Sequence, residues 1–130
     1  MPKILIVEDE FNTRQGLSEI LTEEGFEVAL AEDGANALEK IDIDTDLLLS
    51  DLRLPDITGL DLFKKLKPLY PELVTIIMTA YSTPDLGEEA KDAGVFSWLT
   101  KPLNIEILLS KLQEALIFHK REKNKPMNCV

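Results

Sequence analysis

The sequence predicts an α/β fold built around a parallel sheet. Segments with strand-like patterns alternate with segments with helix-like patterns along the whole chain, and five such pairs fit into the 130 residues. Three of the strand-like segments are continuously apolar, as expected of strands that helices cover on both faces: Ile4–Val7, Leu47–Leu49 and Ile76–Met78. The length suits one domain with a hydrophobic core and is too short for two.

The five strands are expected in the segments that are richest in aliphatic and aromatic side chains: Lys3–Val7, Phe26–Ala31, Asp46–Ser50, Val74–Met78 and Val95–Leu99. Residues that cap or stop helices mark the segments between them. Asn12 followed by Gln15 resembles a capping box, and Gly25 ends this first helix. Asp33 and Gly34 begin the second helix.

The third helix is expected from about Gly59 to Lys67, because Pro68 stops it. The fourth begins where Thr83, Pro84 and Asp85 supply a cap, a proline and an acid, and it ends at Gly94. The inward face of this fourth helix offers only three small or apolar side chains: Leu86, Ala90 and Ala93. It should therefore bury little apolar surface.

The fifth helix begins near Asn104 and carries core side chains at helical spacing: Ile105, Leu108, Leu109, Leu112 and Leu116. After Arg121 the chain is polar and without pattern. We therefore expect one folded domain over residues 1–121, followed by a polar tail or the start of a linker over 122–130.

Composition and charge exclude several classes of protein. Hydrophobic residues make up 45% and charged residues 29%, as in ordinary globular domains, and no apolar run is long enough to span a bilayer. The N-terminus lacks the pattern of a signal peptide, so a cytoplasmic protein without a membrane segment is expected. The single cysteine, Cys129, excludes an internal disulfide. A net charge of −10 argues against direct nucleic-acid binding, and the short basic stretch from His119 to Lys125 fits a solvated helix end.

Polar residues follow four of the expected strands. Ligands of open parallel sheets bind beyond the carboxyl ends of the strands, so these residues should meet at one edge: Glu8, Asp9, Asp51, Thr79 and Lys101. Each alone suits an ordinary solvated loop. Together, three carboxylates would repel one another more than one lysine can offset, which suggests a bound cation. Oxygen ligands select a hard ion such as Mg²⁺.

A carboxylate beside a divalent ion and a lysine can attack a phosphoryl donor and form an aspartyl phosphate. Asp51 is the best candidate because it ends the third, central strand, between the acids of the first strand and the residues of the fourth and fifth.

Four motifs in register resemble the receiver domains of bacterial two-component response regulators: Val7-Glu8-Asp9-Glu10, Asp51-Leu52-Arg53-Leu54-Pro55 with Gly59, Met78-Thr79-Ala80 and Leu99-Thr100-Lys101-Pro102. The resemblance covers about Lys3 to Leu116. It implies a doubly wound, flavodoxin-like (βα)5 fold with strand order 2-1-3-4-5, an order known for the chemotaxis member of the family. Residues 51–62 and 76–104 look most like receivers attached to bacterial enhancer-binding transcription activators.

The resemblance also implies the role of each site residue. Asp51 accepts the phosphoryl group, and Mg²⁺ is held by Glu8, Asp9, Asp51 and the main-chain carbonyl of Arg53. Thr79 hydrogen-bonds the phosphoryl group and Lys101 pairs with it. Arg53 and Tyr81 occupy the positions that tune the lifetime of the phosphorylated state. The aromatic switch residue, usually Tyr or Phe, is here Trp98, which can equally be a half-buried tryptophan at a strand end.

The implied partners are a sensor histidine kinase as phosphodonor and an output domain or effector protein. The fourth helix, fifth strand and fifth helix form the implied output face, which can also support a homodimer. The implied protein is a regulatory switch, not an enzyme with a separate substrate.

Three alternatives share parts of this pattern. A haloacid-dehalogenase phosphatase also uses an aspartate nucleophile and Mg²⁺, but places that aspartate after the first strand, with a second acid where Arg53 stands. A flavin-binding protein needs a phosphate-binding loop after the first strand, where Glu8, Asp9 and Glu10 would repel phosphate. A pseudo-receiver that only binds partners would not require the complete set of acids, hydroxyl and lysine.

Overall fold

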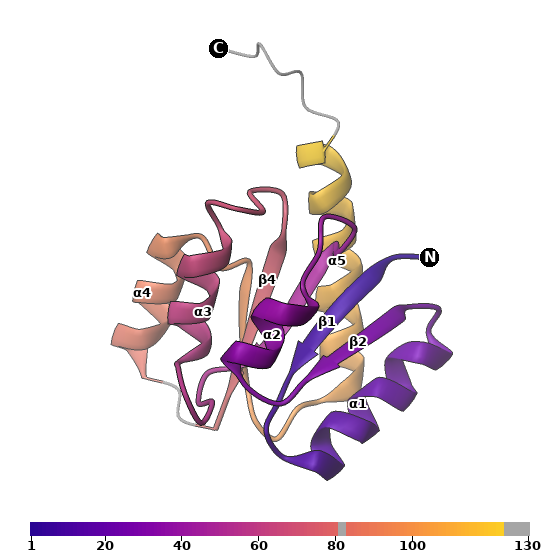
Figure 1. The fold of residues 1–130 in the computed structure, drawn as a ribbon, viewed down its shortest axis with the longest axis horizontal. Helices are drawn as coiled ribbons and strands as arrows, with labels where there is room; N and C mark the ends of the chain where they lie inside the picture. Colours follow the sequence, from indigo (N-terminus) through magenta and orange to yellow (C-terminus); the bar gives the residue numbers. More distant parts are fainter. Residues whose placement is uncertain (81–82, 124–130) are drawn as a thin grey trace.

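The computed structural model describes residues 1–80 and 83–123, which form a five-stranded sheet flanked by helices (Figure 1). The elements follow one another as β1 (Lys3–Val7), α1 (Phe11–Glu23), β2 (Glu27–Ala31), α2 (Gly34–Lys40), β3 (Leu47–Asp51), α3 (Gly59–Leu66), β4 (Val74–Thr79), α4 (Pro84–Ala93), β5 (Ser97–Thr100) and α5 (Ile105–Lys123). All neighbouring strands pair in parallel, in the order β2-β1-β3-β4-β5. The predicted fold class and strand order are confirmed.

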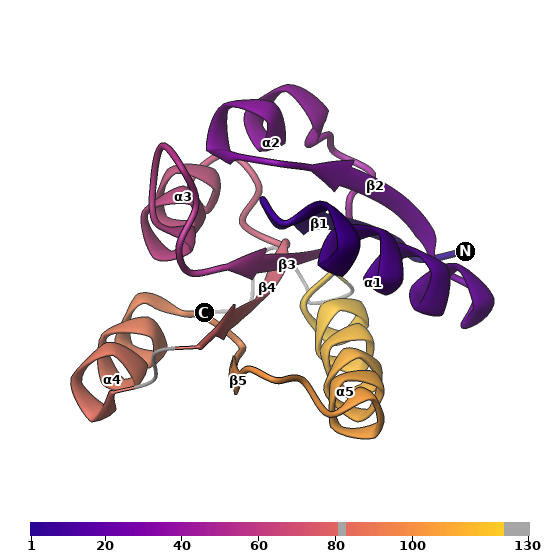
Figure 2. The same cartoon turned by 90° about the horizontal axis from the view of Figure 1, so that it is seen from below.

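Helices cover both faces of the sheet: α1 and α5 lie on one face, and α2, α3 and α4 on the other (Figure 2). Side chains of β1 alternate between these faces. Ile4 and Ile6 pack in the core with residues of α1 and α5, whereas Leu5 and Val7 pack with residues of α2 and α3. Because both faces are buried, the central strands need apolar side chains at every position, which explains their unbroken apolar runs.

The helix ends confirm most of the predicted caps and correct one. Asp33 caps α2 by accepting a hydrogen bond from the Asn36 amide at 2.7 Å, and Gly25 follows α1 with a left-handed φ of 95°. The predicted capping box at Asn12 is wrong: the cap lies two residues earlier, at Glu10, which accepts from the Thr13 amide, and α1 begins at Phe11. The helix starts this early because only Glu8, Asp9 and Glu10 separate it from β1.

Helix α4 is weakly packed. Thr83 caps it and Gly94 ends it, as predicted, but Ala90 is its only buried residue, with Leu86 and Ala93 partly buried against the same cluster. On α5, Leu108 and Leu112 are buried and Leu109 and Leu116 partly so, but Ile105 is 37% exposed, so its assignment to the core is wrong. It lies in the first turn, ahead of the part of α5 that reaches the sheet.

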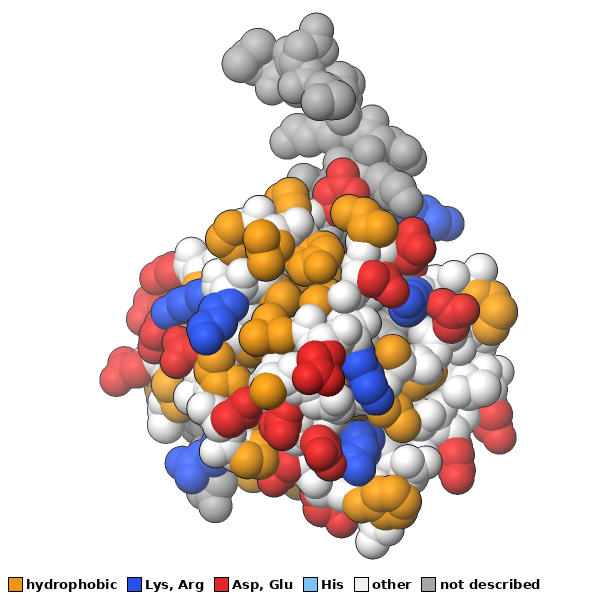
Figure 3. All heavy atoms as spheres, viewed as in Figure 1, with side chains coloured by type: hydrophobic (Ala, Val, Ile, Leu, Met, Phe, Trp, Pro, Cys, Tyr) orange, Lys and Arg blue, Asp and Glu red, His pale blue; other side chains and the backbone are white. Residues whose placement is uncertain are grey.

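Helix α5 continues to Lys123, past the domain end expected at residue 121. Of the tail expected over residues 122–130, the part from residue 124 lies outside the described residues, as does the predicted site residue Tyr81. Within residues 1–80 and 83–123, none of the helices has the length and apolar character needed to cross a bilayer. Acidic side chains are spread over much of the face seen in Figure 3, in keeping with the net charge of −10.

Candidate functional site

The predicted site residues lie together at the carboxyl edge of the sheet. Glu8 and Asp9 directly follow β1, Asp51 and Thr79 are the last residues of β3 and β4, and Lys101 directly follows β5. These four strands are adjacent in the sheet, so their ends meet. With Arg53 and Ala80, the five side chains line a pocket of about 260 Å³.

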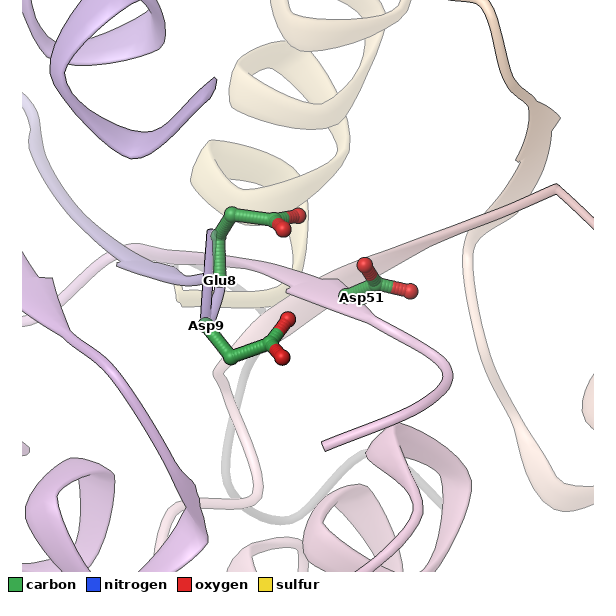
Figure 4. Close-up of side chains that lie close together, drawn as sticks. All are labelled: Glu8, Asp9 and Asp51. Carbon is green, nitrogen blue, oxygen red and sulfur yellow. The ribbon is translucent and has the colours of Figure 1, made fainter. Parts of the chain in front are cut away.

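Three carboxylates face one another in this pocket (Figure 4). One oxygen each of Glu8, Asp9 and Asp51 lies within 4.8 Å of the other two. Glu8 and Asp51 are buried, with only 1% and 8% of their surfaces exposed, whereas Asp9 is exposed. Two of the three negative charges are thus held largely away from water, which strengthens their mutual repulsion.

Lys101 connects the two buried carboxylates. Its ammonium donates hydrogen bonds to Glu8 Oε2 at 2.9 Å and to Asp51 Oδ2 at 2.6 Å. Burial lowers the pKa of Lys101, but the hydrogen bonds to Asp51 and Glu8 outweigh it and raise the pKa above the usual lysine value. Lys101 is therefore a fixed positive charge at neutral pH.

Glu8 has a perturbed acidity. Burial raises the pKa of Glu8 to about 6, the nearby Asp51 carboxylate adds to the rise, and the hydrogen bond from Lys101 opposes it. The Glu10 amide also donates to Glu8 Oε1 at 3.2 Å. Glu8 is thus ionised at neutral pH, but burial and the Asp51 carboxylate destabilise its ionised form, and a bound cation would stabilise it.

The loop from β3 to α3 is packed tightly against Asp51. The Arg53 amide donates to Asp51 Oδ1 at 3.2 Å, and the Gly59 amide donates to the Leu52 carbonyl at 2.7 Å. A Cβ atom on Gly59 would lie 2.3 Å from the Asp51 carbonyl oxygen and 3.0 Å from Ser50 Oγ. Only glycine fits at the first residue of α3, and the start of this helix is therefore in close contact with the backbone of Asp51 at the end of β3.

Gly59→Ala should destabilise the domain by about 1–3 kcal/mol, because the new methyl group overlaps backbone that cannot move without shifting Asp51. Gly16→Ala is the matched control: it lies inside α1 with nothing within 4 Å of its Cβ position, and should stabilise by roughly 0.5–1 kcal/mol. Urea denaturation of both variants measures the difference. Equal stability of Gly59→Ala and the wild type would contradict this account of the loop.

Trp98 is not among the residues that line the pocket with the acids. It is half-buried, pairs in register with Ile77 of β4, and packs against a cluster with residues from α3, α4 and β4. Arg53 is exposed at the rim of the pocket. This position is compatible with both roles considered for Trp98: an aromatic switch residue in contact with the α4 cluster, or an ordinary half-buried tryptophan at a strand end.

Sequence patterns missed two residues that shape the site. Arg14, one turn into α1, donates from its guanidinium to the Glu8 carbonyl oxygen at 2.7 Å and so fixes the backbone after β1. Asp56 ties the β3–α3 loop to α2. Neither has a sequence signal. The Arg14 contact depends on how the short connection after β1 enters α1, and the Asp56 contacts depend on how two separate loops approach one another.

The donor set fits a hard divalent cation. Three carboxylates and one ammonium leave a formal charge of −2 at this edge. The candidate metal ligands of Glu8, Asp9 and Asp51 are all carboxylate oxygens. The same charges disfavour a flavin phosphate beside Glu8, Asp9 and Glu10. The arrangement also differs from the haloacid-dehalogenase pattern, because Asp51 ends the third strand and Arg53 stands where that family places its second acid.

Known proteins resemble this chain over most of its length. A family model described as "Response regulator receiver domain" matches residues 4–113. The DNA-binding transcriptional regulator NtrC of Proteus hauseri is 37% identical over 127 residues, covering 97% of this chain but 27% of that protein. Sporulation initiation phosphotransferase F of Bacillus subtilis is 34% identical, covering 88% of this chain and 93% of that protein. The chain thus spans about a quarter of the first relative and nearly all of the second.

Solved structures show the same architecture. A CheY-like response regulator receiver domain protein from Methanospirillum hungatei has a TM-score of 0.88 at 32% identity, covering 94% of this chain and 98% of that one. A response regulator receiver domain protein from Clostridium thermocellum has a TM-score of 0.85 at 27% identity, covering 92% and 98%.

Proposed function

The chain belongs to the response regulator receiver domain family, and from this premise we propose that it is a Mg²⁺-dependent switch that accepts a phosphoryl group on Asp51. One observation carries the proposal. The Asp51 carboxylate lies beside two further carboxylates, with one oxygen of each within 4.8 Å of the others, and accepts a hydrogen bond from the Lys101 ammonium at 2.6 Å. A nucleophilic carboxylate, ligands for a cation and a fixed positive charge are the parts that phosphoryl transfer requires.

Glu8, Asp9, Asp51 and the main-chain carbonyl of Arg53 are the proposed ligands of Mg²⁺, with Glu8 the most deeply buried of the three acids. When bound, the ion would offset the negative charge of the carboxylates and of an incoming phosphoryl group. The Arg53 amide already donates to Asp51 Oδ1, which fixes the orientation of this carboxylate relative to the loop.

In the proposed reaction, a carboxylate oxygen of Asp51 forms a bond to phosphorus, and the bond from phosphorus to the donor breaks. With a histidine kinase as donor, that bond joins phosphorus to an imidazole nitrogen, and the electron pair leaves with the imidazole. The Lys101 ammonium then pairs with a phosphoryl oxygen, and the Thr79 hydroxyl donates a hydrogen bond to another. The chain promotes only its own phosphorylation and dephosphorylation.

We infer that the conformational response involves α4 and Trp98. A phosphoryl group that draws Lys101 and Thr79 closer would act on the ends of β4 and β5, whose residues Ile77 and Trp98 pack in the same cluster as α4. Because Ala90 is the only buried residue of α4, this helix has little packing to hold it in one position. Arg53 and Tyr81 remain the positions proposed to tune the lifetime of the phosphorylated state.

The proposed partners are a sensor histidine kinase and an output domain or effector, with no direct contact between this segment and nucleic acid. The α4-β5-α5 face is the proposed output face. It offers exposed apolar side chains on α5, among them Ile117 and Phe118, and the Phe118 ring lies 5.3 Å from that of Phe96. If phosphorylation produces a homodimer through this face, the molar mass measured by light scattering should rise when the protein is phosphorylated.

The direct test is incubation with acetyl phosphate, followed by intact-mass measurement with Mg²⁺ or with a chelator. The proposal predicts the addition of one phosphoryl group in Mg²⁺ only, together with a change in Trp98 fluorescence. Protein that binds Mg²⁺ but gains no mass from acetyl phosphate or from a cognate kinase would support a pseudo-receiver instead.

Mg²⁺ affinity should increase as the pH rises through about 6, where Glu8 loses its proton. The pKa of this acid is raised in the folded protein, so below that pH the bound proton removes a negative charge from the site and weakens cation binding. Calorimetric titration in buffers on either side of this pH measures the effect. Glu8→Gln should remove the rise, and a wild-type affinity that is constant across this range would contradict the role given to Glu8.

A further inference from the structure

Asp56 makes an unusual pair of hydrogen bonds for an exposed loop residue. It lies between β3 and α3, and its two carboxylate oxygens accept from two successive amides of α2: Gly34 to Oδ1 and Ala35 to Oδ2, each at 2.9 Å. These bonds lower the pKa of Asp56, so the carboxylate is ionised at neutral pH. The residues are more than 20 positions apart in sequence, so this is a long-range connection and not a local turn.

The contact is close on the α2 side as well. A Cβ atom on Gly34 would lie 2.2 Å from Ile57 Cγ2 and 3.2 Å from Asp56 Oδ1, so only glycine lets the loop approach. Helix α2 has its own cap in Asp33, which accepts from the Asn36 amide. The first turn of α2 therefore binds two carboxylates, one from its own end and one from the loop.

This connection joins the two parts of the backbone that carry the site. On one side, Asp56 is three residues after Arg53, whose amide donates to Asp51 Oδ1. On the other side, α2 follows β2, and the Ala31 carbonyl at the end of β2 accepts from the Glu8 amide at 3.0 Å. Asp56 thus links the loop after Asp51 to the segment that holds Glu8, through the first turn of α2 and the end of β2.

We propose that Asp56 is a positioning residue for the metal site, which holds the Arg53 carbonyl at its distance from the acids by fixing the β3–α3 loop to α2. This inference rests on the proposed Mg²⁺-dependent function. Ligands from two separate loops bind an ion well only if the loops keep their spacing.

The test is the dissociation constant of Mg²⁺, measured by isothermal titration calorimetry on the full chain. Removing a group that orients a metal ligand directly weakens binding roughly 10–100-fold, and because Asp56 acts through the loop backbone, we expect Asp56→Ala to weaken it about threefold to tenfold. Asp56→Asn keeps one accepting oxygen and should lie between Asp56→Ala and the wild type. Gly34→Ala disturbs the same contact from the α2 side and should weaken binding as Asp56→Ala does.

Asp33→Ala is the matched control. It removes one carboxylate and one negative charge from the same end of α2 but leaves the connection to the loop, so its Mg²⁺ affinity should stay within about twofold of the wild type. An equal loss in Asp33→Ala and Asp56→Ala would assign the effect to charge or helix capping and overturn the inference. An unchanged affinity in Asp56→Ala would overturn it too. If the wild type binds no Mg²⁺, the proposed function itself fails.

Discussion

Asp51→Asn should gain no phosphoryl group from acetyl phosphate in Mg²⁺, under conditions in which the wild type gains one. The side-chain amide is a poor nucleophile, and Asp51 is the carboxylate of the cluster that accepts hydrogen bonds from both the Lys101 ammonium and the Arg53 amide. The substitution also removes a negative charge that raises the pKa of Glu8, so this pKa should fall below about 6. Intact mass and an NMR titration of the Glu8 carboxyl carbon measure the two effects.

Asp9→Asn is the control for Asp51→Asn. It removes the exposed acid of the same cluster, which is a proposed metal ligand but not the nucleophile. It should still be phosphorylated when the Mg²⁺ concentration is raised, because weaker binding is overcome by mass action. Phosphorylation of Asp51→Asn to the same extent as the wild type would show that the phosphoacceptor has been wrongly assigned.

Lys101→Met should be the most destabilising substitution of a charged residue in the site. It leaves the buried Glu8 and Asp51 carboxylates without their shared cation. Breaking a buried ion pair typically costs about 3–5 kcal/mol, and because the Lys101 side chain is 24% exposed, we expect about 1–3 kcal/mol in metal-free buffer at neutral pH.

The stability lost in Lys101→Met should increase as the pH rises. Without the lysine hydrogen bond that lowers it, the pKa of Glu8 should rise above about 6. An acid whose folded pKa is raised loses stability as the pH rises, so the defect should grow as the pH increases through and beyond that value, and Mg²⁺ should recover part of it. Lys64→Met, which breaks the exposed pair with Glu89, is the control and should cost at most about 1 kcal/mol. Equal losses in both variants would contradict the bridging role of Lys101.

The central strands of the fold could be predicted because a strand that is buried on both faces of the sheet has a continuous run of apolar residues. A strand such as Leu47–Asp51 has no exposed position, so its apolar run identifies it without knowledge of its neighbours. Helix caps were less certain, since a cap depends on where the preceding loop ends. The Asn12 pattern was locally plausible, but the short connection after β1 starts α1 at Phe11 and leaves the cap to Glu10.

The site could be predicted as a set of residues but not as a set of contacts. The end of each strand could be located from its apolar run, and parallel pairing brings those ends together, so Glu8, Asp51 and Lys101 were expected at one edge. Which groups bond there depends on loops that meet in space. The bridge from Lys101 to Glu8 spans 93 positions, and the connection from Asp56 to Gly34 spans 22. Neither separation leaves a periodic signal.

The most direct test of the central claim is to locate the phosphoryl group after incubation with acetyl phosphate and Mg²⁺. Borohydride reduction converts an aspartyl phosphate to homoserine, and peptide mass spectrometry identifies the converted residue. Asp9 is the more exposed acid of the cluster, so accessibility alone would favour it. We predict conversion at Asp51 only, because Lys101 and the Arg53 amide position that carboxylate. Conversion at Asp9, or at an acid outside the cluster, would contradict it.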